Sequence, residues 1–323
     1  MKRLKNKFIY FVGLPLMVIL GVVSINIINN LNNRSLNSEF IYDMSEKNYK
    51  RVYLLDESNT LVPLTIEISK KENLVDEIYT VVSNLRDLKI EGFTNILGND
   101  IKINKIEIND GILKIDFSKE FLDYNKDLEE KIIESLTWSV MEFDEINGLT
   151  ISVEGELLKT MPLNGYVIPE VLDKSIGINK YSEMITRCND CKDMVVVYSK
   201  VINEKEYYVP VTRLISEDDY TFVSAYNKQV SVLSGLNKIV ELDKLDDVNI
   251  EEDNMNINID ESYLVEDNLV NSDVYELLMV MLYYNDFDYK VNFFINNESV
   301  EVNGYKNNED IQVSSIKINE IEI

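Results

Sequence analysis

The chain has 323 residues, with 57 acidic against 32 basic side chains, a formal net charge of −25 and no histidine. This charge disfavours binding to nucleic acid, and the lack of histidine excludes Ser-His-Asp and Cys-His catalysis and removes the commonest metal ligand. Hydrophobic residues make up 45% of the chain, which is enough for folded domains of ordinary size. We therefore expect a folded protein without these histidine-dependent mechanisms, and we expect no cofactor.

The N-terminal part of the chain has the pattern of a membrane anchor. A basic tail at residues 1–7 precedes an apolar, uncharged run at residues 8–28. As a helix this run would span about 30 Å, the thickness of a bilayer's hydrocarbon core. Because basic flanks stay in the cytoplasm, we predict a single-pass protein of the cell membrane whose bulk is extracytoplasmic. The alternative is a cleaved secretory signal, which usually has a shorter apolar core and a small-residue cleavage site.

A polar stalk is expected at residues 29–50, and the chain beyond it shows an internal repeat. Residues 51–68 and 195–215 each contain two alternating apolar segments around a polar turn, which predicts a β-hairpin. Pro63 in the first hairpin corresponds to Pro210 in the second, 147 positions later. The match suggests a tandem duplication.

A helix is expected after each of these hairpins. The sequence Ser69-Lys-Lys-Glu72 has the spacing of a capping box, and Ser216 to Asp219 has the same spacing at the same 147-position offset. Apolar residues then recur at helical spacing, regularly in the first copy and less so in the second. Gly92 and Gly235 are the expected helix ends.

A second hairpin follows at residues 102–118, with Asn109-Asp110-Gly111 at its tip, and its counterpart lies at residues 247–262. Asp-Gly between alternating strands is a strong hairpin signal. An Asp-x-Ser pair stands at Asp116 and Ser118, and a similar pair at Asp260 and Ser262, 144 positions later. These residues could form a ligand site, but we favour a structural reading in which the Asp faces solvent and the Ser caps the next turn.

Each copy ends with a helix, a strand and an Asn-Gly-Tyr sequence, at Asn164–Tyr166 and at Asn303–Tyr305. Trp138 lies next to the apolar face of the first of these helices and is expected in the core. The order hairpin, helix, hairpin, helix, strand predicts an α+β fold of two tandem modules, each a small sheet covered by two helices. We place the first module at residues 51–175 and a second, degenerate module at residues 194–323.

The linker between the modules, at residues 176–193, contains Cys188 and Cys191 in a C-x-x-C motif. This pair is a candidate disulfide. Redox catalysis would need the motif at a helix start after a strand, and a zinc site would need a second ligand pair. No metal site is expected.

Tyrosine is abundant, at 19 residues, and two adjacent pairs stand out. Since tyrosine is enriched at protein interfaces, Tyr207, Tyr208, Tyr283 and Tyr284 are candidates for a partner surface. One member of each pair is expected to face the core, because neighbours on a strand point to opposite sides.

Several of these features resemble the GerMN domain family of sporulation and germination proteins. The resemblance rests on the Asn109-Asp110-Gly111 turn, the strand Leu113–Phe121, the strand Ile151–Val153 and the sequence Asn164-Gly165-Tyr166. It covers residues 51–170 well and residues 194–310 more weakly. Relatives are often lipoproteins, whereas this chain has no lipid-accepting cysteine beside its apolar run.

The resemblance implies a fold similar to the ring-building motifs of secretion-system scaffolds and a role that is not enzymatic. It also implies that the chain supports a membrane complex between mother cell and forespore, in the intermembrane space of the sporulating cell. The first hypothesis is thus an anchored scaffold or assembly factor with protein partners, or one that self-associates. The alternatives are an ectodomain that binds a small molecule or wall fragment, and a thiol-redox protein.

Overall fold

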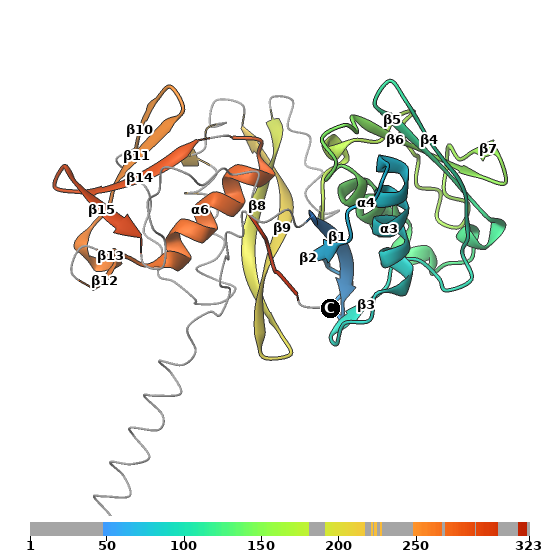
Figure 1. Cartoon of the computed structure of the whole chain (residues 1–323), viewed down its shortest axis with the longest axis horizontal. Helices are drawn as coiled ribbons and strands as arrows, with labels where there is room; N and C mark the ends of the chain where they lie inside the picture. Colours follow the sequence, from blue (N-terminus) through green and yellow to red (C-terminus); the bar gives the residue numbers. More distant parts are fainter. Residues whose placement is uncertain are drawn as a thin grey trace, which may run out of the picture. The chain divides into compact units, whose positions relative to one another are not determined.

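The computed structural model describes residues 48–180, 191–216, 221, 223–224, 227, 248–266, 269–287, 289–302 and 316–321, all within one compact α+β unit (Figure 1). The predicted anchor at residues 8–28 and Cys188 lie outside these ranges. Within them, no helix is long and apolar enough to cross a membrane.

The first element is the expected hairpin. Strand β1 (Asn48–Asp56) pairs antiparallel with β2 (Leu61–Ile68), and its end also pairs with the short β3 (Phe93–Thr94). Nearly all side chains of β2 are buried, so this is a core hairpin rather than a half-exposed one. Since β1 begins at Asn48, the last three residues of the predicted stalk belong to the sheet.

Helix α3 (Leu74–Asp87) begins later than the Ser69 capping box predicts. Its N-cap is Asn73, whose side chain accepts a hydrogen bond from the Asp76 amide at 2.9 Å. Asn is as good a cap as Ser, and here it stands directly before the apolar face of the helix. The predicted capping box at Ser69 is therefore wrong, and the helix ends at Asp87, before Gly92.

The second sheet of this module has the order β4-β5-β6-β7. Strands β4 (Ile103–Asn109) and β5 (Ile112–Phe117) form the predicted hairpin, with positive φ at Asp110 (51°) and Gly111 (78°) in its two-residue turn. The chain then passes through two 3₁₀ turns and through helix α4 to the parallel strand β6. The bounds are η2 Lys119–Leu122, η3 Lys126–Leu128, α4 Glu129–Val140, β6 Gly148–Val153 and β7 Glu156–Leu157.

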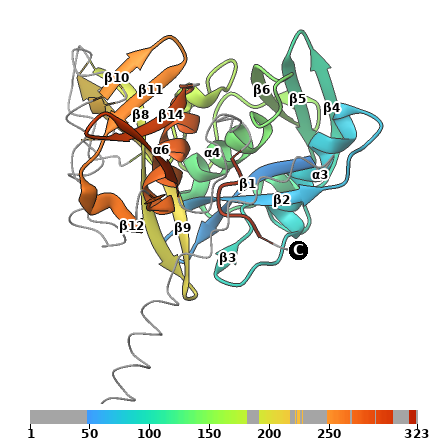
Figure 2. The ribbon, with the colours of Figure 1, turned by 60° about the vertical axis from the view of Figure 1, so that its left-hand side comes forward.

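The two helices of this module lie between two sheets, not on one face of a single sheet. Helix α3 contacts β1, β2 and β4, and helix α4 contacts β1 and β6, as Figures 1 and 2 show. The far face of the β4–β7 sheet is polar, because alternate residues of β5 are buried and partly exposed. Trp138 on α4 is in the core as predicted, 1% exposed, with its Nε1 donating to the Gly177 carbonyl at 2.8 Å.

The second module begins after the 3₁₀ turn η4 (Lys174–Ile176), and its described residues show a similar order of strands around a helix. A long hairpin comes first, and a six-stranded sheet of order β10-β11-β14-β15-β13-β12 follows, in which β11 and β14 are parallel and joined through α6. The bounds are β8 Cys191–Ile202, β9 Lys205–Ser216, β10 Val248–Glu251, β11 Asn254–Asn258, η7 Glu261–Tyr263, β12 Leu264–Glu266, β13 Leu269–Val270, α6 Ser272–Tyr284, β14 Lys290–Ile295 and β15 Glu298–Val302. The second capping box lies outside the described residues beyond Ser216.

The strand pairs set the register between the two modules. Asn109 pairs with Ile112 across the two-residue turn of the first hairpin, and Glu251 pairs with Asn254 across that of the second, so equivalent positions are 142 apart. At this offset Asp116 corresponds to Asn258, and Ser118 corresponds to Asp260. The predicted repeat of the Asp-x-Ser pair at 144 positions is therefore wrong by two residues.

Candidate functional site

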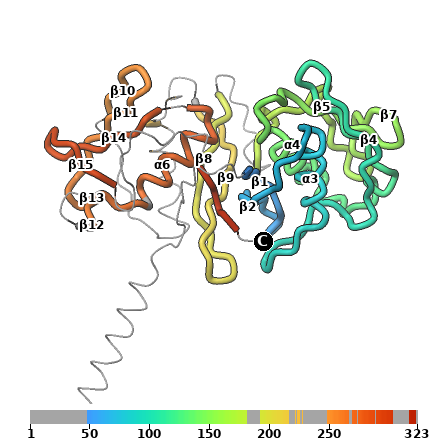
Figure 3. The backbone as a smooth tube through the Cα atoms, viewed as in Figure 1, coloured from blue at the N-terminus to red at the C-terminus, as the bar shows by residue number. Residues whose placement is uncertain are grey.

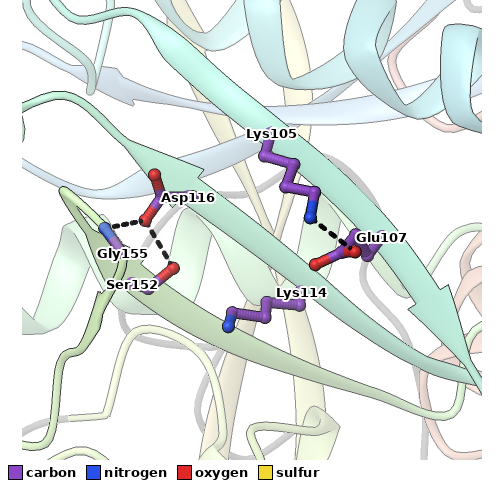
Figure 4. A pocket seen from close by; sticks show the side chains of 6 residues that line it. All are labelled: Lys105, Glu107, Lys114, Asp116, Ser152 and Gly155. Carbon is purple, nitrogen blue, oxygen red and sulfur yellow. Dashed lines mark hydrogen bonds and ion pairs between the residues drawn. The ribbon is translucent and has the colours of Figure 1, made fainter.

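Asp116 is the most densely bonded polar side chain on the open face of the β4–β7 sheet (Figure 4). One carboxylate oxygen accepts from the Ser152 hydroxyl at 2.6 Å and from the Gly155 amide at 2.7 Å. The other accepts from the Asn104 side chain at 3.2 Å. Burial acts to raise the pKa of Asp116, but these hydrogen bonds outweigh it and hold the pKa below its ordinary value.

This network fixes the turn between β6 and β7. Glu154 (φ 51°) and Gly155 (φ 85°) both have left-handed backbone, which only glycine adopts without cost. The Asp116 carboxylate binds the Gly155 amide and so stabilises the turn from the neighbouring strand. As the sequence reading favoured, Asp116 has a structural role.

The rest of this face carries charges of both signs. Lys105 and Glu107 form an exposed ion pair at 2.7 Å, and on the neighbouring strand Asp116 lies opposite Lys105 and Lys114 opposite Glu107, all four lining a pocket (Figure 4). An exposed pair of this kind contributes little to stability. The face is suited to a polar contact rather than to enclosing a small molecule, which usually needs a deeper and more apolar cavity.

Neither serine of the predicted Asp-x-Ser pairs caps a turn with its side chain. Ser118 stands at the N-cap of η2, but its hydroxyl accepts from the Lys102 amide at 3.0 Å and joins the start of the β4 segment to the end of β5. In the second module the cap is Asp260, which accepts from the Ser262 amide at 2.9 Å. The capping prediction for the two serines is wrong.

The sequence reading missed a buried carboxylate, Glu129, at the start of α4. It is 1% exposed and accepts from the Tyr124 hydroxyl at 2.6 Å. It also accepts from three backbone amides of the Asn-Gly-Tyr loop, those of Leu163, Asn164 and Tyr166, at 2.7 to 3.1 Å. These hydrogen bonds outweigh burial and hold the pKa of Glu129 below its ordinary value. This carboxylate thus holds the loop together with the loop's own backbone hydrogen bonds, such as that from the Met161 amide to the Tyr166 carbonyl at 2.9 Å.

The tyrosines predicted as a partner surface are mostly buried within the chain. Tyr207, Tyr208 and Tyr284 are 5%, 7% and 5% exposed, and Tyr283 is partly buried. The Tyr207 ring packs edge-on against Phe93 of the first module at 5.1 Å between centroids. Both members of the first pair are buried because β9 packs against the first module. These four tyrosines therefore do not form the exposed surface that the sequence predicted.

Tyr283 and Tyr284 belong to a buried polar cluster that joins the two modules. The Tyr283 hydroxyl donates to Glu142 at 2.8 Å, and the Tyr284 hydroxyl lies 3.3 Å from that of Tyr53. Burial raises the pKa of each of these tyrosines, so their hydroxyls, which are protonated at neutral pH in any case, become still harder to ionise.

Arg51 completes this cluster. Its Nε lies 2.6 Å from the Glu142 carboxylate, and its guanidinium stacks over the Tyr283 ring at 3.9 Å. A second guanidinium nitrogen donates to the Ile316 carbonyl at 2.7 Å. Because unpaired buried charges are strongly destabilising, loss of either member of the ion pair would weaken the contact between modules.

The cysteine prediction stays open. Cys191 is the first residue of β8, two residues before the predicted end of the linker, and Cys188 lies outside the described residues. Among the residues that the structure covers, no three Cys, Asp or Glu side chains converge in a way that could hold a metal ion.

Comparison with known proteins agrees with the fold. Residues 51–159 match the family model Germane, described as sporulation and spore germination. The chain is 31% identical over 194 residues to the spore germination protein GerM of Bacillus subtilis strain 168, which covers 58% of this chain and 53% of that protein. The alignment thus spans about half the length of that relative.

The fold is similar to a solved structure of the tandem GerMN domains of the sporulation protein GerM from Bacillus subtilis. The match has a TM-score of 0.64 at 23% identity and covers 81% of this chain and 99% of that one. The chain therefore carries a Germane (GerMN) domain at residues 51–159 within a tandem GerMN fold, and it is similar to GerM.

Proposed function

We propose that this chain is a non-enzymatic assembly factor in endospore formation or germination, which acts by protein–protein contacts. The observation that carries the proposal is the match to the tandem GerMN domains of a sporulation protein over 99% of that solved chain. The 31% sequence identity to a spore germination protein points to the same process.

The use of the polar side chains supports a role without turnover. Asp116, Glu129 and Glu142 are each engaged by hydrogen-bond donors of the chain itself. A catalytic acid or base must instead reach a proton of the substrate. These carboxylates stabilise turns, loops and the contact between modules, as expected of a rigid protein that acts by binding.

The proposed site of action is the outer side of the cell membrane, to which residues 8–28 would anchor the modules. In a sporulating cell this is the intermembrane space between mother cell and forespore. The proposed partners are proteins of a membrane complex there, with a second copy of the chain as a further candidate.

The test uses the full-length, C-terminally tagged chain in sporulating cells. We expect it in the membrane fraction at its full length, and we expect crosslinking to capture specific membrane proteins with it. The double variant Val18→Lys with Ile19→Lys should leave the membrane, since each central lysine costs about 2.5–3.5 kcal/mol of insertion free energy. The matched control, Val18→Leu with Ile19→Leu, should remain there.

A shortened and fully released protein would contradict the anchor. Capture of the same proteins by an unrelated anchored protein would contradict the role in assembly. The double variant Cys188→Ser with Cys191→Ser separates this proposal from thiol chemistry. We expect it to retain localisation and capture, and a loss of function in a folded, anchored variant would favour the redox alternative.

A further inference from the structure

Strands β2 and β9, one from each module, lie side by side, as Figures 1 and 3 show. Within the described part of the chain they share no strand pairing. Pro63 and Pro210 stand at equivalent positions of the two strands, 147 residues apart. Because proline has no amide hydrogen, neither strand can offer a continuous ladder to the other at this point. Buried polar groups at these two edges need other partners.

Asn179 supplies such partners on one side. Its Oδ1 accepts from the Leu61 amide at 2.9 Å, and its Nδ2 donates to the Leu61 carbonyl at 2.8 Å. The same Nδ2 donates to the carbonyl of Pro210 at 2.9 Å. The Asn179 side chain thus hydrogen-bonds to both the amide and the carbonyl of one β2 residue and also to a carbonyl of β9.

Asn319 does the same in the opposite direction. Its Oδ1 accepts from the Tyr208 amide at 2.8 Å, and its Nδ2 donates to the Tyr208 carbonyl at 2.8 Å. The same Nδ2 donates to the carbonyl of Pro63 at 2.7 Å. Leu61 and Tyr208 are 147 positions apart, as are the two prolines, so the two sets of hydrogen bonds are equivalent under the repeat.

The residues before each asparagine extend this equivalence. The Thr212 amide of β9 donates to Ile178 at 2.8 Å, and the Thr65 amide of β2 donates to Ile318 at 3.2 Å. Each Ile-Asn segment follows one module, and its Ile carbonyl binds the edge strand of the other while its Asn side chain binds both edge strands. Both asparagines have left-handed backbone, with φ of 50° and 55°, which asparagine tolerates better than most residues. Both are nearly buried, at 5% and 6% exposure.

We propose that Asn179 and Asn319 are a matched pair of amide clamps that lock the two modules into one rigid body. In this arrangement residues 316–321 bind the β2 edge of the first module and also strand β9 of the second, so the segment bridges the two modules. The Thr65 amide, the Arg51 guanidinium and the Lys205 ammonium all bind backbone carbonyls of this segment. The proposal stands independently of a role in sporulation.

Hydrogen exchange of the full chain tests the clamps one at a time. Asn179→Gly should raise exchange of the Leu61 amide at least tenfold, and Asn319→Gly should do so for the Tyr208 amide. Glycine adopts positive φ without cost, so these variants remove the amide and leave the backbone unstrained. The matched control is Asn59→Gly, at an exposed turn residue with φ 58°.

The double variant should unfold in two transitions, where the parent unfolds in one. Leu61 and Tyr208 amides that stay as protected as in the parent would overturn the proposal. So would an equal effect of Asn59→Gly. If the double variant does not fold, the two single variants still decide, because each must expose its own strand amide and leave the other protected.

Discussion

The two modules share a backbone plan but differ in their polar networks. Apolar residues recur at the 142-position offset, since Leu113, Ile115 and Phe117 of β5 correspond to Met255, Ile257 and Ile259, all at most 9% exposed. The residues of the Asp116 hydrogen-bond network do not recur at this offset. The positions equivalent to Asp116, Ser152 and Gly155 hold Asn258, Phe294 and Asn297.

This difference shows which features a duplicated fold needs. Alternating burial and the parallel strand pair across the helix are kept in both copies, because they build the core. Side-chain networks that fix individual turns can be replaced when the turn changes. The family model matches residues 51–159, the module in which the Asp116 network is present.

The largest expected effect is a loss of core packing in either module. Leu136 on α4 and Leu278 on α6 are equivalent and fully buried. Leu136→Ala and Leu278→Ala should each lower the free energy of unfolding by about 2–5 kcal/mol. If the modules are one cooperative unit, both variants shift the same single transition in urea, followed by circular dichroism and tryptophan fluorescence. Leu→Met at the same sites is the control, with a loss below about 1.5 kcal/mol. Two separate transitions, one for each module, would contradict unfolding of the two modules as one cooperative unit.

A smaller effect is expected from Glu129→Gln, because the amides that bind the carboxylate would lose its charge. The loss at neutral pH should be about 2 kcal/mol, as for hydrogen bonds to charged groups. The exposed neighbour provides the control, and Glu130→Gln should change stability by less than about 0.5 kcal/mol.

The destabilisation by Glu129→Gln should decrease at low pH. The pKa of Glu129 is lower in the folded chain than in the unfolded one, so its contribution is complete above the unfolded value of about 4.3. The contribution fades as the pH falls through the folded-state pKa. Urea unfolding of parent and variant at decreasing pH should therefore converge. If the difference in unfolding free energy between parent and variant stayed constant to the lowest pH, the destabilisation would come from the changed shape of the side chain and not from its lost charge.

The smallest effect is expected from Asp116→Asn, which gives the first module the residue of the second. The free energy of unfolding should fall by about 1 kcal/mol, because an amide binds Ser152 and Gly155 less strongly than a carboxylate does. The reciprocal variant Asn258→Asp should bring no gain, since Phe294 has no hydroxyl to donate. Urea unfolding measures both. A gain from Asn258→Asp would mean that the two modules still share this network.

The sequence predicted the order of elements, the hairpins and the Asp110-Gly111 turn, because each depends on residues close together in the chain. It placed the start of α3 wrongly because Ser69 and Asn73 both have the chemistry of a cap, and only packing decides between them. It misaligned Asp116 with Asp260 because two similar strings lie two residues out of register, and strand pairing alone resolves them.

The long-range contacts were beyond a reading of local patterns. The amides that bind Glu129 lie 34 to 37 residues further along the chain. The clamps did leave a signal, since Ile-x-Ile-Asn occurs at residues 176–179 and again at 316–319. The tyrosine prediction failed because an adjacent pair looks the same in sequence whether its strand or helix faces solvent or another module, and Tyr207–Tyr208 on β9 and Tyr283–Tyr284 on α6 both face the first module.

The most direct test of the proposed role is a count of heat-resistant spores, with germination scored separately, in cells that lack this protein. We predict a loss of spore yield or a slower germination, restored by the full-length chain and not by the Val18→Lys, Ile19→Lys variant. Normal spore yield together with normal germination in the deletion strain would contradict the account.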